Sequence, residues 1–263
     1  MLNGSVAVSF EITAIAYVVL AGSRFSGERA NRKLGPSKDW RSTSLRVSAI
    51  ICVTVLIFSA RRDMHKQAKT ATQQLRIGEW VKGLAAMRDS EFTLEAVQDY
   101  ILQRSVLPET LDKYLFFSKG NYTRNLIFKN DVFECMTICW EIGQFSRIHN
   151  HRDQNCWMSA PIGRLRVQNF RVDERDAAQS TCHIVPTDTY DMDAAHPAYV
   201  NPLEPVHQVL NLKEFNERAV SIHVYSKPFD TCEIYQREKG TYADVPLHYT
   251  SEYGKLNPAE KLL

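Results

Sequence analysis

The 263-residue sequence lacks a strong excess of charge of either sign. Lysine and arginine total 32 against 30 aspartates and glutamates, which leaves a formal net charge of +2. A nucleic-acid-binding domain usually carries a clustered positive excess, so the composition predicts no nucleic-acid partner. With 44% apolar residues the chain can form one domain with a substantial core, and two small domains are the alternative.

The sequence also lacks the closely paired cysteines of zinc ribbons and small disulfide scaffolds. None of its six cysteines lies in a C-x-x-C pair, and Cys135 and Cys139 alone are close in sequence. This usage favours reduced thiols and a cytoplasmic protein. Cys135 and Cys139 share an apolar run with Trp140 and are expected in the core.

No apolar run reaches the roughly 20 residues that a transmembrane helix needs. Residues 5–22 contain Glu11, and the run 47–60 stops at Arg61. A basic stretch separates the two runs, so two short spans or an uncleaved anchor are alternatives. Met64 begins a compact remainder, and a leader outside the working protein explains the pattern as well. We divide the chain into a leader, 1–63, and a domain, 64–263, and expect no membrane association outside the leader.

Two kinds of periodicity follow the leader. From Gln74 to Leu115 the pattern is helical, with Thr93 as a predicted N-cap and Pro108 closing the segment. After about Tyr122 it changes to short alternating runs with turn residues between them, at 133–140, 164–170, 182–186, 207–212 and 219–226. We expect a helical N-terminal cap followed by an antiparallel β sandwich or barrel.

Two histidines lie two residues apart in "SRIHNHRDQNCW" (146–157). Alternate residues of a strand project from one face, so His149 and His151 would point together, with Ile148 and Asn150 opposite. Two such imidazoles can chelate a metal ion if a third ligand joins them. An H-x-H pair alone is also a common chance feature of protein surfaces.

The wider spacing matches two motifs of the cupin superfamily. The first motif takes in a glycine, the two histidines, a further ligand position and a second glycine, here Gly143, His149, His151, Cys156 and Gly163. The second supplies a proline, a third histidine and an asparagine, here Pro202, His207 and Asn211. Glu204 stands where a glycine is expected. Cys156 stands where cupins usually have a glutamate ligand.

The loss of that glutamate leaves three neutral histidines around a doubly charged ion. Such a site suits a substrate that brings its own soft anionic ligand, and a thiolate does so well with iron. From the residues alone, Cys156 is either such a thiolate itself or an ordinary buried cysteine.

Four stretches resemble the cysteine dioxygenases: "YTRNL" (122–126), "CWEIG" (139–143), the histidine pair with Cys156, and "SIHVYSKPFDTC" (221–232). The resemblance covers about residues 75–250. It implies a mainly β fold, a cupin-type antiparallel barrel (jelly roll) with a helical N-terminal cap. It also implies a monomeric iron(II) enzyme of cysteine catabolism and taurine biosynthesis, which oxidises L-cysteine with O2 to cysteine sulfinic acid (3-sulfinoalanine).

By matched position, the resemblance assigns the iron to His149, His151 and His207. It implies that Arg124 and Tyr122 bind and support the substrate carboxylate. Three alternating residues of "AVSIHVYS" match a hydrogen-bonded series that ends in a phenol reaching the substrate, namely Ser221, His223 and Tyr225. In some members the cysteine matching Cys156 is joined to the tyrosine matching Tyr225 by a thioether. Cys156 would then be a tether for a catalytic phenol.

Alternation supports this assignment independently, because Ser221, His223 and Tyr225 share one strand face and three aliphatic residues share the other. The remaining histidines, His183, His196 and His248, have no partner at ligand spacing and are expected to be structural or exposed. Cys232 matches a family cysteine near the site, and packing explains it equally well.

The chain departs from the family pattern in two places besides the leader. Lys227 replaces the first proline of a Ser-Pro-Pro sequence, which puts the unusual cis bond of that sequence in question. Extra residues between Cys182 and Pro205 are expected to lengthen the loop before His207.

Two other functions compete with the cysteine dioxygenase. One is a dioxygenase for 3-mercaptopropionate or another small thiol; relatives with that preference tend to carry glutamine at the position of Arg124, so the arginine favours cysteine. The other is a non-catalytic metal-binding cupin, in which Tyr122, Arg124 and the Ser-His-Tyr series would have no purpose.

Overall fold

The computed structural model describes residues 73–200 and 203–258. All of them belong to one compact unit, Ala68–Leu263. The predicted leader, 1–63, and Pro202 of the second cupin motif lie outside the described residues. A search of the described helices finds none that is both long and apolar enough to cross a membrane.

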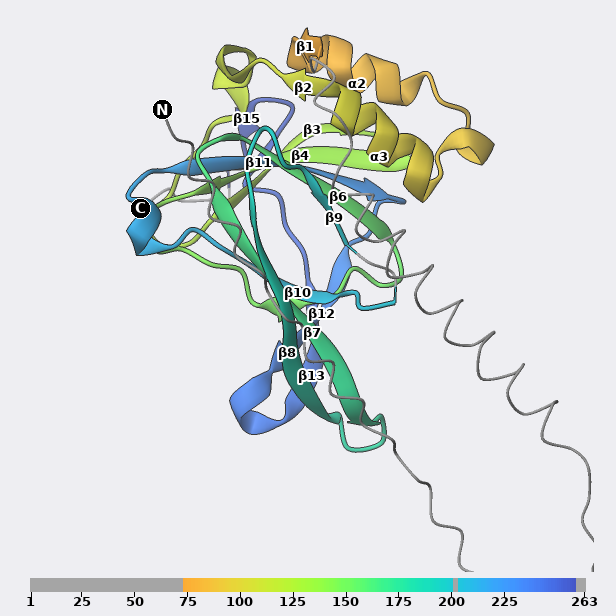
Figure 1. Cartoon of the computed structure of the whole chain (residues 1–263), viewed down its shortest axis with the longest axis vertical. Helices are drawn as coiled ribbons and strands as arrows, with labels where there is room; N and C mark the ends of the chain where they lie inside the picture. The colour runs from red at the N-terminus through yellow and green to blue at the C-terminus, as the bar shows by residue number, and fades with distance from the viewer. Residues whose placement is uncertain (1–72, 201–202, 259–263) are drawn as a thin grey trace, which may run out of the picture. The chain divides into compact units, whose positions relative to one another are not determined.

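The N-terminal cap contains the two helices α2 (Ile77–Ala85) and α3 (Leu94–Gln103), at the orange and yellow end of Figure 1. Thr93 begins α3 as predicted, because its hydroxyl accepts a hydrogen bond from the backbone N–H of Ala96 at 3.2 Å. One 3-10 turn follows α2, at Asp89–Glu91, and two lie after α3, at Pro108–Thr110 and Asp112–Tyr114.

The prediction of helix over 74–115 is wrong at two short segments. Gln73–Leu75 (β1) and Arg104–Val106 (β2) pair as a parallel two-stranded sheet instead. Backbone pairing between the segments that flank the two helices outweighs the local helical periodicity there.

Two larger sheets form the rest of the described chain. The first has seven strands in the order β15-β14-β3-β4-β11-β6-β9. These are Lys255–Leu256, Ser251–Glu252, Thr123–Lys129, Phe133–Trp140, Ala219–Ser226, Asn155–Ile162 and Ala198–Tyr199. The second closes on itself as a barrel in the order β10-β5-β12-β13-β8-β7. Its strands are Val206–Leu210, Ile148–His149, Thr231–Gln236, Thr241–Pro246, Thr181–Met192 and Leu165–Asp176.

The seven-stranded sheet is buried on both faces. Residues of odd number on β4, such as Cys135 and Cys139, pack with α2 and α3 in one hydrophobic cluster. Residues of even number, such as Met136 and Ile138, join a second cluster with strands of the barrel, including Val167 of β7. The helices therefore cover one face and the barrel sheet covers the other. This confirms the expected cupin-type β fold with a helical N-terminal cap.

Glycine and asparagine of the cupin motifs hold turns in this fold. Gly163 connects β6 to β7 at φ +71°, and a Cβ there would lie 2.5 Å from the backbone oxygen of Arg218. The buried Asn211 amide donates to the backbone oxygens of Trp140, Glu141 and Glu217 at 3.3, 3.2 and 2.9 Å. These residues shape the chain around the site without touching its centre.

The expected loop between Cys182 and Pro205 is mostly strand. β8 pairs with β7 as far as Met192, and both strands extend well beyond the short apolar runs that signalled them (Figure 1). The added parts of the two strands carry charged side chains on both faces, so the sequence there shows no alternation of apolar and polar residues. Single-turn 3-10 helices at Lys213–Phe215 and Arg237–Lys239 complete the described elements.

Candidate metal centre and substrate cavity

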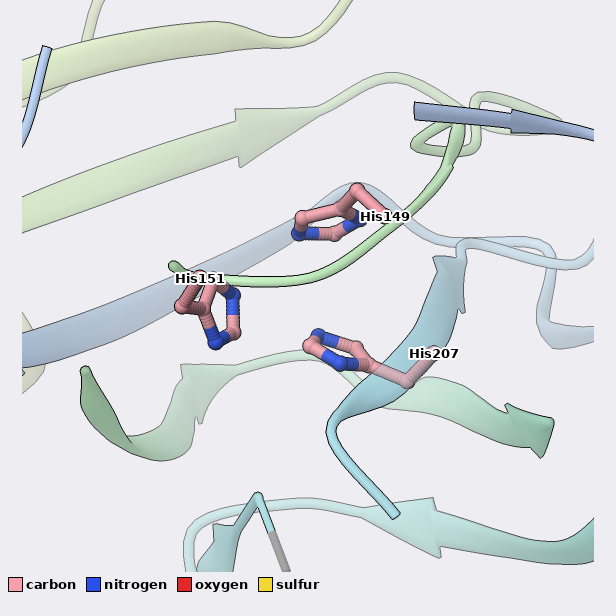
Figure 2. A group of neighbouring side chains, drawn as sticks. All are labelled: His149, His151 and His207. Atoms are coloured by element: carbon pink, nitrogen blue, oxygen red, sulfur yellow. The ribbon is translucent and has the colours of Figure 1, made fainter. Parts of the chain in front are cut away.

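Three histidines from two parts of the chain converge on one point. His149 ends β5, His151 follows two residues later, and His207 lies on β10 (Figure 2). One nitrogen from each ring lies within 4.8 Å of the others. The ring centroids are 4.6–5.1 Å apart. Among the described residues, this is the one cluster of histidine, cysteine and acidic side chains with a spacing suited to a metal ion.

Strand pairing brings the third histidine to the first two. His207 lies directly opposite His149 in the antiparallel β10–β5 pair. The strand predicted to carry both His149 and His151 stops at His149, because Arg152 and Asp153 turn the chain with φ of 54° and 63°. The two imidazoles still point to the same centre, as the H-x-H spacing predicts.

The three imidazoles are held neutral. Burial is the first cause, and it lowers the pKa of His149 to about 4 and those of His151 and His207 well below the usual value. Nδ1 of His149 lies 2.8 Å from the backbone oxygen of Arg147, and Nδ1 of His207 lies 3.3 Å from that of Pro205. A neutral ring that donates from Nδ1 presents the lone pair of Nε2 to the centre.

The residues present fit a divalent transition metal. Both ring nitrogens of His151 and Nε2 of His207 are buried with no hydrogen-bond partner. Buried polar atoms without partners are rare and costly, and a metal ion would satisfy them. Imidazole donors suit zinc, copper, iron and nickel, so the ligands define a metal centre without specifying the metal.

Cys156 lies beside Tyr225 and outside the histidine cluster. The two residues are directly opposite each other in the β6–β11 pair, and both are buried. Burial raises the pKa of the Cys156 thiol well above its usual value, and a hydrogen bond with Tyr225 only partly offsets this. Its sulfur is not among the side-chain atoms of the described residues that converge within metal-ligand distance, all of which come from the three histidines. The structure therefore does not place Cys156 as a thiolate ligand of this centre.

The polar face of β11 forms a continuous hydrogen-bonded series. Trp140 Nε1 donates to Ser221 Oγ at 3.0 Å. Ser221 Oγ lies 2.8 Å from His223 Nε2, and His223 Nδ1 lies 3.0 Å from the Tyr225 hydroxyl. The Tyr225 ring also contacts His151, with centroids 5.0 Å apart. The series thus leads from the sheet interior to the metal centre.

A cavity of about 900 Å³ reaches two of the three histidines, His149 and His151, and its other walls include Tyr122, Arg124, Trp140 and Tyr225. Tyr122 stacks on Trp140 with ring centroids 4.7 Å apart, and burial raises its pKa. The Arg124 guanidinium lies 5.8 Å from the ring centroid of Tyr249. No described residue forms an ion pair with Arg124, and none of the lining residues is acidic. The cavity wall at Arg124 can therefore bind an anionic group of a ligand.

Two residues of the site were given no role by the sequence pattern. Trp140 was named only as a neighbour of Cys135 and Cys139 in an apolar run, although alternation along 133–140 already places it on the opposite face from Cys139. Phe229 packs against Tyr225 and His151 with centroids 5.0 and 5.9 Å away, from a segment without regular structure. No periodic signal identifies such a residue.

The remaining sequence candidates divide between cavity and surface. Cys232 and His248 line the cavity. For Cys232 the sequence allowed either a place near the site or simple packing, and for His248 it predicted a structural or exposed position. His183 and His196 are exposed, each beside an aspartate. The Ser226–Lys227 peptide bond is cis, so the cis bond expected from the family is present although Lys227 replaces the proline.

Fold and site together define the class of protein: a cupin with a three-histidine centre. The profile of the family described as "Cysteine dioxygenase type I" matches residues 68–238. The chain is 29% identical to "Cysteine dioxygenase type 1" of Danio rerio over 174 residues, which cover 66% of this chain and 85% of that protein. It is 30% identical to the proteins of that name from Rattus norvegicus and Homo sapiens over 169 residues, 64% of this chain and 82% of each relative. The chain belongs to the cysteine dioxygenase type I family, and it is an oxidoreductase of the thiol dioxygenase class.

Proposed function

We propose that this chain is an iron(II)-dependent dioxygenase that converts L-cysteine and O2 to cysteine sulfinic acid (3-sulfinoalanine). The observation that carries the proposal is a cavity lined by Arg124, which has no carboxylate partner, and by two histidines of the three-histidine cluster, His149 and His151. Such a cavity can hold a metal-bound thiol and read its carboxylate at the same time.

The donor set is compatible with iron and a thiol substrate. A bound ferrous ion supplies the activation of O2 and the affinity for thiolate. His149, His151 and His207 would hold it without contributing negative charge, so the charge of the substrate thiolate is not opposed by a protein carboxylate. Both oxygen atoms of O2 are transferred to sulfur, so that R–SH and O2 give R–SO2H.

Arg124 would bind the carboxylate of cysteine. Its planar guanidinium suits bidentate binding of a carboxylate, and the wall around it offers no competing acidic group. Tyr122, fixed by its stacking on Trp140, lies on the same wall and would support the bound carboxylate. A thiol without a carboxylate would lose this contact.

Tyr225 would place its hydroxyl against the bound substrate. Its pKa is raised well above the usual value, first by burial, so the phenol keeps its proton at neutral pH and can donate a hydrogen bond. The same cavity is lined by apolar side chains, including Ile138, Val209 and Phe229, and by polar ones, including Gln144 and Ser146.

The proposal extends to the setting of the enzyme. We propose that residues 64–263 form the catalytic domain, as a monomer in the cytoplasm, and that 1–63 is a leader without a part in catalysis. Two features support the division of the chain at residue 64. The family match begins at residue 68, and every site residue lies beyond it.

The test is aerobic incubation of the purified, iron-loaded protein with L-cysteine and 18O2. We expect one sulfinate per O2 consumed, with both sulfinate oxygens labelled. Parallel reactions with 3-mercaptopropionate identify the competing substrate preference. Tight iron binding without turnover of either thiol would favour the non-catalytic cupin and contradict the proposal.

A further inference from the structure

Asn150, the residue between His149 and His151, binds the buried carboxylate of Glu233, and neither Asn150 nor Glu233 lines the cavity. Its side-chain N–H groups donate to Glu233 Oε2 at 2.9 Å and to the Tyr235 hydroxyl at 3.1 Å. Its Oδ1 accepts from the backbone N–H of Glu233 at 3.4 Å, and its own backbone N–H donates to the Glu233 carbonyl at 3.1 Å. Backbone and side chain of Asn150 are thus both fixed to one residue of β12.

Glu233 is in turn fixed by an arginine from another strand of the barrel. Arg175 of β7 donates to both carboxylate oxygens, at 3.1 and 2.5 Å, and Tyr235 donates to Oε2 at 2.6 Å. The guanidinium carbon lies 4.1 Å from the ring centroid of Tyr242 on β13. Burial alone would raise the pKa of Glu233, but these hydrogen bonds lower it below its usual value, so the carboxylate is charged.

The segment after His151 has contacts of its own: Gln154 N–H donates to the His151 carbonyl at 3.0 Å, and Arg152 forms an ion pair with Asp244. β5 ends at His149, and the turn after it contains two residues of positive φ, Arg152 and Asp153. The rings of His149 and His207 have backbone carbonyls beside Nδ1, whereas neither nitrogen of His151 has a hydrogen-bond partner. No hydrogen bond to the ring fixes the direction of His151, which is set by packing against Tyr225 and Phe229 and by its backbone, where the preceding residue, Asn150, is fixed to Glu233.

We propose that Glu233 is a positioning residue for the metal centre: held by Arg175, it fixes Asn150 and thereby aims His151 at the metal. The inference rests on the proposed function in requiring a metal on the three histidines. It adds an ion pair that lies outside the cavity and touches no substrate. Outer partners of this kind typically change metal affinity by about 10- to 100-fold.

The test measures iron(II) affinity by competition with a chromogenic chelator, without reference to turnover. Asn150→Asp places a second carboxylate against Glu233, and we expect affinity to fall by about 10- to 100-fold. Glu233→Gln alone, which weakens the Arg175 pair, should lower it in the same direction. The double variant, Asn150→Asp with Glu233→Gln, again pairs an amide with a carboxylate and should recover most of the loss.

Asp191→Asn is the matched control. Asp191 of β8 accepts two hydrogen bonds, at 2.7 and 3.2 Å, from Arg166, which lies on β7 as Arg175 does; neither residue contacts Asn150, so the loss of this pair should leave iron affinity unchanged. Thermal unfolding of each metal-free variant confirms folding, and Glu233→Gln keeps the test decisive if Asn150→Asp does not fold. Wild-type affinity in Glu233→Gln, or no recovery in a folded double variant, would overturn the inference alone. Failure of the wild-type protein to bind iron would overturn the proposed function and the inference with it.

Discussion

The indole of Trp140 and the hydroxyl of Ser221 are joined by a hydrogen bond of 3.0 Å in which the indole can only donate. Ser221 must therefore give its own proton elsewhere, and among the described residues the acceptor within its reach is His223 Nε2, at 2.8 Å. Neutral His223 then carries its proton on Nδ1 and donates it to the Tyr225 oxygen at 3.0 Å. The phenol proton of Tyr225 is left free for the side on which the metal centre and Cys156 lie.

This arrangement requires His223 to stay neutral, which gives a prediction for stability against pH. Burial lowers its pKa to about 3 from an unfolded value near 6.5. Between those pH values the unfolded chain binds a proton that the folded chain does not, so stability falls as pH falls through that range. We expect the metal-free His223→Gln variant to lose less stability on acidification, by at most about 1.4 kcal/mol per pH unit. Urea unfolding at pH 7, 6 and 5 measures the slope, and identical slopes in both proteins would contradict the expectation.

Loss of one histidine should empty the metal centre. His207→Ala leaves two imidazoles where three converge, and we expect severe loss of bound iron and no measurable turnover. His183→Ala is the matched control, because His183 is exposed and lies beside Asp173. Metal analysis after purification checks the prediction. An iron content in His207→Ala equal to that of the control would remove this histidine from the centre.

Arg124 should discriminate between thiols with and without a carboxylate. We expect Arg124→Gln to reduce turnover of cysteine far more than that of cysteamine, which lacks the carboxylate. A charge-assisted hydrogen bond contributes about 1.5–3 kcal/mol, roughly one to two orders of magnitude in affinity. Steady-state kcat/KM for the two thiols gives the ratio. Equal losses would show that Arg124 does not bind the carboxylate.

The parts of the fold that the sequence predicts are those with strong alternation. The runs 133–140 and 219–226 coincide with β4 and β11, and Val220 and Ile222 face the helices while Tyr225 faces the barrel, as parity requires. Residues 171–176 of β7 are mostly exposed, and backbone pairing with the first half of β8 defines them instead of apolar periodicity. Local patterns carry no information about such pairing.

In the site too, the sequence predicts some residues and not others. The spacing of the H-x-H pair and of His207 predicts three histidines near one another, and the structure brings them together. The carboxylate behind Asn150 could not be found in this way, because Glu233 is 83 residues further along the chain. Its contact with Asn150 depends on the register of β12 against β5, which pairs Ile234 with His149.

The position of Cys156 opposite Tyr225 leads to the last prediction, a thioether between them. Directly opposed side chains of antiparallel strands have Cβ atoms about 4.5–5.5 Å apart, close enough for sulfur to reach the ring carbon next to the hydroxyl. The bond would form with loss of the thiol hydrogen and one ring hydrogen. The two electrons and two protons would pass to O2 and give hydrogen peroxide.

Such a bond would fix the phenol against the metal centre, which is preorganisation of an existing group. We expect intact mass after aerobic turnover to show a fraction of chains lighter by two hydrogens. Cys156→Ser should remain partly active and lose that species, and Tyr225→Phe should lose the species and more of the rate. Cys182→Ser, which changes a buried cysteine of the barrel strand β8, should retain it. Peptide mapping that finds Cys156 always free in an active enzyme would show that the tether is absent, and Cys156 would then contribute packing against Tyr225 and no more.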